Sequence, residues 1–251
     1  MRTIASVEKG LRVLEVIAET PEGVRVKDIS KRMEMPTSNI CLFLNALERS
    51  GFVTKDNQAG CYYVSQKFFA IAKKAELSKY SHLIQVAKPH MRKLRDEFDE
   101  NVLLTVLSGH NIQFIERLQS SRSVQILHDP DVSYPPHVTA GGKAILAFLD
   151  SRSLQKYLAA ALYHPFTEKS IVDPQSLRQE LAKIVSRGYA VNVGEYEPEI
   201  MAISSPIRNA GDVVGSIVVQ FPRFRYREED LPSFGERVVA TTDAVAEALN
   251  L

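Results

Sequence analysis

Side chains at positions 37–45 have the types and the spacing that suit contact with base edges in DNA. The periodicity predicts a helix here that buries Ile40, Leu44 and Leu47. Asparagine on its other face can pair with adenine N6 and N7, and serine or threonine can bond phosphates or base edges. The face lacks arginine, so we expect weak readout of guanine. The candidate reading face comprises Thr37, Ser38, Asn39, Cys41, Leu42 and Asn45.

Further candidate DNA contacts lie on both sides of this helix in the sequence. Arg25 and Lys27 lie in or just before a shorter predicted helix, residues 26–34, where their charges suit phosphate contacts. Lys55 and Asn57 lie in the turn-rich segment 55–60 and complete the predicted DNA-binding set. Helix, charge and turn together predict a double-stranded DNA partner.

The first 66 residues have the pattern of a winged helix-turn-helix domain. Met35-Pro36 separates two short helices, because the residue before proline avoids the helical region and proline favours the next first turn. Gly51 ends the third helix, and segments 52–54 and 61–64 read as a two-stranded wing. The first helix is expected to turn inward a face made of Val7, Leu11, Leu14 and Ala18, with Val13 and Ile17 beside it.

The charge is distributed unevenly along the chain. The formal net charge is only +1, but residues 1–95 hold 17 Lys and Arg against 9 Asp and Glu, and residues 96–251 hold 14 against 21. Chance scatter of surface charge could produce such a difference. Because the basic part also contains the helix-turn-helix pattern, we favour a polyanionic partner for that part alone.

The remainder of the chain predicts linker helices over 67–88 and an α+β domain over 89–251. Alternating apolar residues predict a hairpin at 102–107 and 112–118, a third strand at 124–127, and a second hairpin at 200–208 and 213–221. Helical spacing predicts helices at 140–149, 151–161, 174–187 and 228–249, with a strand at 188–193. Strands and helices mixed in this way indicate a sensor-like domain built on one sheet.

Patterns for catalysis, metal binding and membrane insertion are weak. Thr139–Lys143 lacks the spacing of a phosphate-binding loop, Ser204-Ser205 lacks the frame of a hydrolase, and Cys41 and Cys61 have no metal spacing. His128-Asp129-Pro130-Asp131 reads as a polar turn, and Glu195, Glu197 and Glu199 as exposed loop charges. We therefore expect no catalysis, no cofactor, no metal and no membrane partner. No signal peptide is recognised, so a cytoplasmic location is expected.

Several motifs follow one another in an order that is characteristic of one family. They are Ser6-Val7-Glu8-Lys9-Gly10-Leu11, Met35-Pro36-Thr37-Ser38, Leu47-Glu48-Arg49-Ser50-Gly51-Phe52-Val53, Pro89-His90, His137-Val138-Thr139-Ala140-Gly141-Gly142-Lys143-Ala144, Arg187-Gly188-Tyr189-Ala190-Val191, Glu195-Tyr196-Glu197-Pro198 and Ile203-Ser204-Ser205-Pro206-Ile207. With these, the chain resembles the IclR family of transcription regulators over nearly its whole length. The resemblance implies a winged helix joined by a linker helix to a GAF/PAS-like effector-binding domain. It also implies a homodimer or dimer of dimers on a near-palindromic operator.

The resemblance also implies an effector site. In the family, backbone amides at a helix start help to bind a small carboxylate, which here matches Ala140 and Gly141, with Gly142 next. The glycines could instead only allow close packing, and Thr139 could be a helix cap. Other positions depart from the family pattern, which favours a larger, partly apolar or aromatic acid, or no effector at all. The remaining candidates are Asn192, Ala202, Val218 and Gln220.

Two functions of different class remain open at this point. The first is a DNA-binding transcription regulator controlled by a small molecule. The second is a small-molecule sensor or enzyme domain whose winged helix serves protein contact. Salt-dependent binding to DNA distinguishes them, since neutralised phosphates release counterions and affinity then falls steeply with salt.

Overall fold

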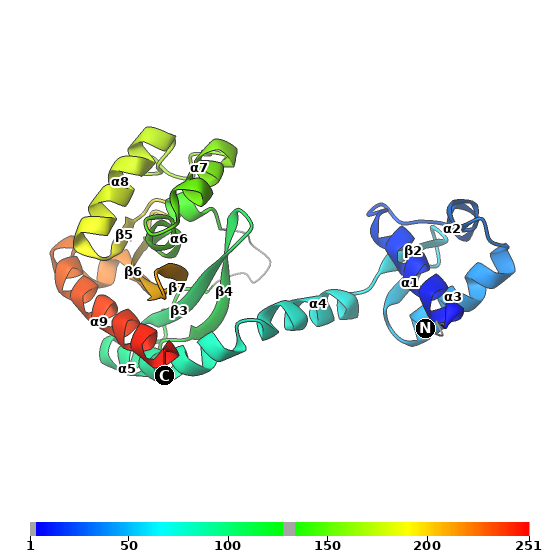
Figure 1. Ribbon diagram of the computed structural model, residues 1–251, viewed down its shortest axis with the longest axis horizontal. Coiled ribbons are helices and arrows are strands. Elements are labelled where there is room, and N and C mark those ends of the chain that lie inside the picture. Colours follow the sequence, from blue (N-terminus) through cyan, green and yellow to red (C-terminus); the bar gives the residue numbers. More distant parts are fainter. Residues whose placement is uncertain (1–3, 128–133, 251) are drawn as a thin grey trace. The chain divides into compact units, whose positions relative to one another are not determined.

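The chain folds into two compact units. The computed structural model describes residues 4–127 and 134–250, and the units divide between Lys79 and Tyr80 (Figure 1). The second unit contains the whole of the helix at Ser81–Phe98, which packs on the sheet of that unit, and the domain start predicted at residue 89 lies within this helix. The predicted polar turn at His128-Asp129-Pro130-Asp131 lies outside the described residues. Within the described ranges, no helix is long and apolar enough to cross a bilayer.

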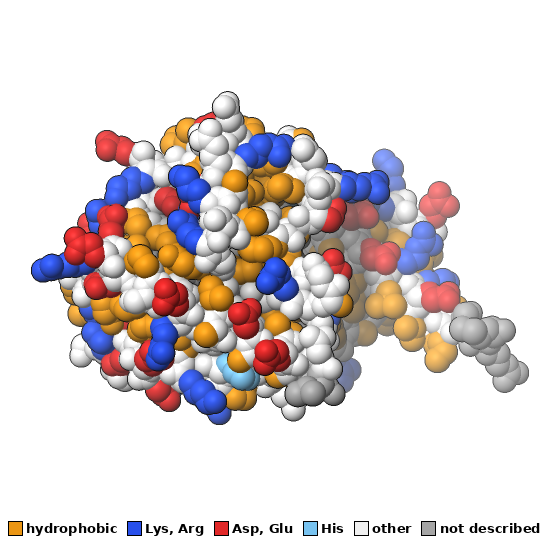
Figure 2. All heavy atoms as spheres, turned by 60° about the vertical axis from the view of Figure 1, so that its left-hand side comes forward, with side chains coloured by type: hydrophobic (Ala, Val, Ile, Leu, Met, Phe, Trp, Pro, Cys, Tyr) orange, Lys and Arg blue, Asp and Glu red, His pale blue; other side chains and the backbone are white. Residues whose placement is uncertain are grey.

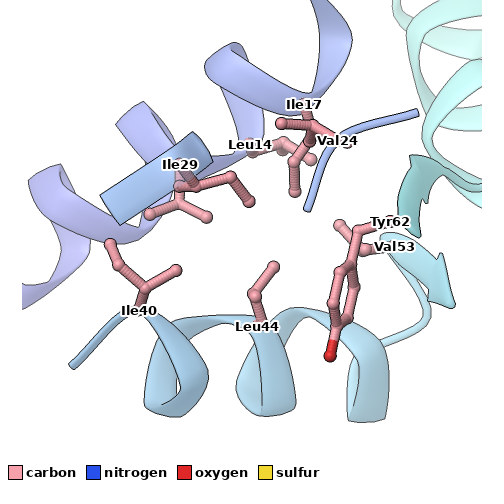
Figure 3. Packing of buried hydrophobic residues seen from close by; sticks show 9 residues of the cluster. Leu14, Ile17, Val24, Ile29, Ile40, Leu44, Val53 and Tyr62 are labelled. Atoms are coloured by element: carbon pink, nitrogen blue, oxygen red, sulfur yellow. The ribbon is translucent and has the colours of Figure 1, made fainter. Parts of the chain in front are cut away.

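The N-terminal unit is a winged helix-turn-helix followed by one further helix. Its elements are α1 (Ala5–Ala18), α2 (Val26–Met33), α3 (Thr37–Arg49), β1 (Val53–Asp56), β2 (Cys61–Val64) and α4 (Gln66–Ser78). Strands β1 and β2 pair antiparallel as the wing. Figure 3 shows the apolar side chains that converge between the three helices and the wing, namely Leu14, Ile17, Val24, Ile29, Ile40, Leu44, Val53 and Tyr62.

The buried face of α1 differs from the predicted one. Val13, Leu14 and Ile17 are buried, whereas Val7 and Leu11 are each 55% exposed and Ala18 is also exposed. The apolar spacing of this helix fits two neighbouring faces, and only the positions of α2 and α3 decide which one enters the core.

The turn between α2 and α3 follows from local chemistry. Glu34 adopts a left-handed conformation, with φ of 51°, and the Met35 N–H donates to the Ser30 carbonyl over 3.1 Å. Pro36 then precedes the first turn of α3. At the other end of α3, Gly51 has φ of 74°, a conformation that costs glycine little and allows the chain to enter β1.

The C-terminal unit is built on one antiparallel sheet in the order β4-β3-β7-β6-β5. The strands are β3 (Asn101–Ser108), β4 (Asn111–Leu118), β5 (Ala190–Val193), β6 (Ile200–Asn209) and β7 (Asp212–Pro222). Helices α5 (Ser81–Phe98) and α9 (Leu231–Leu249) pack on this sheet and on each other, and α6 (Ala140–Leu146) also packs on it, with α8 (Pro174–Arg187) against α6. Helix α7 (Ser151–Ala160) shares an apolar cluster with α6 and α8 (Figure 1).

Side chains alternate between the two faces of the sheet. In β6, Ser205 accepts a hydrogen bond from Thr242 of α9 over 2.9 Å, while Ala202 belongs to an apolar cluster with Ala140 of α6. The helices α9 and α6 therefore cover opposite faces, since alternate strand residues point to opposite sides. The predicted strand at 124–127 does not form, and these residues lie in an irregular segment.

Candidate functional sites

The outer face of α3 is open to solvent over its whole length. Ile40 and Leu44 are fully buried on the inner face and fix the rotation of the helix. All six residues of the candidate reading face are exposed, and Leu42 is 68% exposed. The helix can therefore enter a groove without any rearrangement of the N-terminal core.

The wing and the start of α2 are tied together by backbone hydrogen bonds. The Val24 N–H donates to the Tyr62 carbonyl over 3.2 Å, and the Tyr62 N–H donates to the Val24 carbonyl over 2.9 Å. This bridge, which the sequence did not reveal, attaches the segment before α2 to strand β2. The four flanking candidates, Arg25, Lys27, Lys55 and Asn57, are all exposed.

The C-terminal unit carries charges of both signs on the face shown in Figure 2. On the face shown in Figure 2, basic and acidic side chains are interspersed around apolar areas. This face therefore offers no continuous basic surface for a polyanion.

A cavity lies between the sheet and the start of α6 in the C-terminal unit. Its volume is about 60 Å³, several times the roughly 10–15 Å³ that one water needs. Strand register explains how distant residues meet there: Asn192 pairs with Ala202, Ala202 with Gln220, and Leu103 with Val218. Six of the seven predicted effector residues line the cavity, namely Ala140, Gly141, Asn192, Ala202, Val218 and Gln220.

The seventh predicted effector residue, Gly142, does not line the cavity. Its N–H donates to the Thr139 side-chain oxygen over 3.1 Å, and a Cβ there would lie 2.3 Å from backbone atoms of Pro136. Thr139 thus caps α6 while also lining the cavity. Close packing therefore accounts for glycine at 142, and the assignment of Gly142 to an effector site stays a prediction.

Two hydroxyls that the sequence did not single out lie at the start of α6, and one of them, that of Thr105, lines the cavity. The hydroxyls of Thr105 and Ser216 lie 2.6 Å apart, and Ser216 also donates to the Gly141 carbonyl over 3.1 Å. A Cβ on Gly141 would lie 2.9 Å from Thr105 Oγ1. The close approach of α6 to the sheet therefore depends on glycine at 141. Only the strand alternation, which places Thr105 on the same face as Leu103, could have indicated this contact.

Asn192 has a structural role at the edge of the cavity. Its Nδ2 donates to the Val138 carbonyl over 2.6 Å, and its Oδ1 accepts from the Glu195 N–H over 3.0 Å. Both ends of the amide therefore fix the backbone before α6 and after β5. An aspartate here would lose the donor to Val138.

Beside the cavity, Lys143 and Glu195 form a buried ion pair. Lys143 is 1% exposed and also donates from Nζ to the Val191 carbonyl over 2.7 Å. Burial raises the pKa of the Glu195 carboxyl, and the charge of Lys143 opposes that rise. The side chain of Glu195 is only 13% exposed, so its interpretation as an exposed loop charge was wrong.

His137, just before α6, is held neutral. Burial, with a smaller contribution from Lys143, lowers the pKa of its imidazole to about 4. Its Nδ1 lies 2.9 Å from the Tyr157 hydroxyl, while Nε2 has no hydrogen-bond partner within the described part of the chain. The segment that leads into α6 is therefore buried and fixes the position at which the helix begins.

A winged helix with an exposed polar face, joined to a sheet domain with a cavity at the start of α6, is the architecture of a ligand-responsive transcription regulator. The family model "IclR helix-turn-helix domain" matches residues 6–57, and "Bacterial transcriptional regulator IclR C-terminal" matches residues 75–247. The chain belongs to the IclR family. It is a DNA-binding regulator with an effector-binding C-terminal domain, in a family of regulators and not of enzymes.

Known relatives match along nearly the whole chain. The HTH-type transcriptional regulator BhcR of Paracoccus denitrificans is 27% identical over 98% of this chain and 85% of its own length. The crystal structure of Thermotoga maritima IclR covers 99% of this chain and all of its own, with 25% identity and a TM-score of 0.69. An IclR homologue from Microbacterium hydrocarbonoxydans, solved with 4-hydroxybenzoate, has a TM-score of 0.67 at 23% identity, covering 98% and 99%.

Proposed function

We propose that the exposed face of α3 reads an operator in the major groove while the wing and the start of α2 hold the DNA backbone. The observation that carries this proposal is the open polar face of α3 on a helix fixed by Ile40 and Leu44. Asn39 and Asn45 suit adenine, and Arg25, Lys27 and Lys55 suit phosphates. Asn57 lies in the wing turn beside Lys55.

Fluorescence anisotropy with the DNA upstream of the protein's own gene tests the reading face. Asn39→Ala and Asn45→Ala should each weaken specific binding by about 1–3 kcal/mol, whereas Lys27→Ala should weaken binding to all sequences and flatten the salt dependence. Glu48→Ala, an exposed change on α3 outside the reading face, is the matched control. Unchanged affinity in both asparagine variants would remove α3 as the reader.

We propose further that the cavity binds a small carboxylate with an apolar or aromatic body. Leu103, Ala202 and Val218 supply apolar wall. The N–H groups of Ala140 and Gly141 come before the Lys143 N–H, which donates to the Thr139 carbonyl, so they have no acceptor within the helix and suit a carboxylate. The 4-hydroxybenzoate bound to the Microbacterium relative is a carboxylate of this kind. By the family resemblance, Val218 and Gln220 stand at positions that usually carry serine, so this wall offers fewer polar donors to a small keto acid.

Isothermal titration calorimetry tests this ligand class. An acid with an apolar body should bind more tightly than glyoxylate or pyruvate, because apolar wall contributes roughly 25 cal/mol per Å² of buried surface. Gly141→Val should abolish binding by filling the cavity, and Gly10→Val, at a helical glycine whose added Cβ would meet its nearest neighbour at 3.6 Å, is the control. Tight binding of glyoxylate or pyruvate would contradict the proposal.

We propose that the regulator acts as a homodimer or dimer of dimers on a near-palindromic operator. An occupied cavity would shift the population of arrangements in which paired α3 helices fit two half-sites. Sedimentation velocity with a one-half-site and a two-half-site duplex tests this. A single protomer on the two-half-site duplex would count against it.

A further inference from the structure

We infer that the operator presents the 5-methyl group of a thymine to Leu42, and that this apolar contact at the centre of the α3 reading face selects A·T base pairs. The inference rests on the proposed function, since it concerns the DNA that the same helix reads. It names the base chemistry more narrowly: a thymine methyl group between adenine edges, without readout of guanine.

The first observation is the place of Leu42 on α3. Ile40 and Leu44 point into the N-terminal core (Figure 3). Leu42 stands two residues from each of them, and each residue turns by about 100°, so it lies about 160° around the helix axis from both. Leu42 is therefore on the side of α3 directly opposite the core.

Leu42 is exposed and has no packing role in the N-terminal unit. Its exposed fraction is 68%. Among the described residues, those that pack against the N-terminal core include Phe43 and Leu47 of the same helix but not Leu42. The stability of the fold therefore does not depend on this side chain, and its apolar surface is available to a partner.

The second observation is the set of small polar side chains around Leu42. Residues three and four apart on a helix are neighbours, which places Ser38 and Asn39 one turn before Leu42 and Asn45 one turn after it. All three are exposed. Within the described part of the chain, no hydrogen bond occupies the side-chain amide of Asn39 or Asn45. Both amides are therefore available to base edges on either side of Leu42.

These residue types match the A·T base pair in the major groove. Thymine presents there a methyl group that no other base carries, and adenine presents N6 and N7, which asparagine can bind together. Leu42 against the amino group of cytosine or adenine would bury a donor without an acceptor, which costs free energy. Guanine is read best by arginine or lysine, and positions 37–48 contain neither. Thymine is therefore the base that complements Leu42.

Uracil in place of thymine isolates the methyl group. Two duplexes of the DNA upstream of the protein's own gene, one with thymine and one with uracil at every such position, differ only in their 5-methyl groups. We expect fluorescence anisotropy with the full-length protein to give about fourfold weaker binding to the uracil duplex for each half-site engaged. This is the effect of one methyl group removed from apolar contact.

Variants then assign the effect to Leu42. Leu42→Ala should weaken binding to the thymine duplex and should bind both duplexes equally. Leu42→Met keeps a long apolar side chain and should keep the preference for thymine. Glu48→Ala, an exposed change on the same helix, is the matched control and should also keep the preference. Circular dichroism confirms folding of each variant.

The outcomes separate this inference from the function on which it rests. Equal binding of the two duplexes by the parent protein overturns the thymine contact but leaves α3 as a reader through its asparagines. A preference for thymine that persists in Leu42→Ala also overturns it, because the preference would then come from DNA shape or from another residue. Failure of the parent protein to bind the thymine duplex would remove the proposed operator reading, and this inference with it.

Discussion

Replacement of Lys143 by methionine removes one partner of the buried ion pair at nearly constant volume. Methionine has a long flexible side chain that can follow the path of the lysine stem. The change takes away the donor to the Val191 carbonyl, 2.7 Å from Nζ, and the only cation in contact with Glu195 that the described structure contains. The other carboxylate oxygen, Oε2, is already buried without a hydrogen-bond partner there.

The expected loss is large because the remaining charge is buried. Removal of one partner of a buried pair costs about 3–5 kcal/mol of unfolding free energy, mostly through the partner left behind. The double variant Lys143→Met with Glu195→Leu should therefore recover most of the loss. Lys183→Met is the control, since Lys183 is 69% exposed and lies 3.5 Å from Glu180, a surface pair worth less than about 1 kcal/mol.

The loss should also depend on pH, with a sign that the structure fixes. Burial raises the pKa of Glu195 above its ordinary 4.5, and Lys143 opposes that rise, so its removal raises the pKa further. A carboxyl whose pKa is raised on folding stabilises fully below its unfolded pKa, and that stability is lost as pH rises through the folded pKa. The deficit of Lys143→Met should therefore grow as pH rises above the ordinary carboxyl pKa of 4.5.

Urea denaturation followed by the tyrosine signal in near-UV circular dichroism measures these quantities. The midpoint of the C-terminal transition should fall in Lys143→Met, with the slope unchanged. A midpoint within error of the parent, or a deficit that shrinks as pH rises, would refute the argument from the buried pair.

Three further predictions concern other buried groups of the C-terminal unit. Gly142→Ala places a Cβ 2.3 Å from the Pro136 backbone and should lower the unfolding free energy by about 1–3 kcal/mol. Gly10→Ala, whose Cβ has its nearest contact at 3.6 Å, should be neutral or stabilising by up to about 1 kcal/mol. Thermal denaturation compares the two variants. The His137 pKa of about 4 lies below its ordinary 6.5, so the unfolding free energy should fall by up to about 3 kcal/mol as pH drops from 6.5 to 4. If His137→Asn loses as much stability over this pH range as the parent protein, His137 is not the group responsible. Arg225→Met removes the main partner of Glu100, which is 2% exposed and accepts two 2.6 Å hydrogen bonds from Arg225, and should lower the unfolding free energy by about 3–5 kcal/mol in urea denaturation. Arg223→Met breaks only a surface ion pair with Glu228 at 3.6 Å and should cost less than about 1 kcal/mol. Equal losses in the two variants would refute the distinction between the buried and the surface pair.

The local pattern predicted most elements because their periods are set by residues near in sequence. The helices of the winged unit and both hairpins of the sheet unit form where the spacing indicated. The strand at 124–127 failed for a long-range reason. Its carbonyls are bound by distant side chains, Asn101 to Ile126 over 2.7 Å and Arg225 to Val124 over 2.8 Å, so backbone groups that a strand would pair are satisfied otherwise.

Of the residues that line the candidate cavity, the sequence predicted only those that could be matched to positions of the IclR family. Asn192, Ala202, Val218 and Gln220 were assigned by matching family positions, and register then explains why they meet on one face. Three aromatic residues that line the cavity were missed, namely Phe114, Tyr134 and Tyr196. They lie in a strand, an isolated bridge and a bend, and no regular spacing along the sequence connects them. Nothing in a single sequence brings such residues together before the sheet is assembled.

The two glycines at the start of α6 show why sequence alone left packing and binding as equal alternatives. Both lack a side chain for a steric reason, but against different neighbours: Gly141 faces Thr105 and Val218 on the cavity side, and Gly142 faces the Pro136 backbone behind it. Each residue along a helix turns by about 100°, so adjacent positions necessarily face different neighbours. Close packing at Gly142 and Thr139 therefore sets the direction of the helix start, and that direction leaves Gly141 beside the ligand space. Packing at one glycine is the condition for an open site at the other.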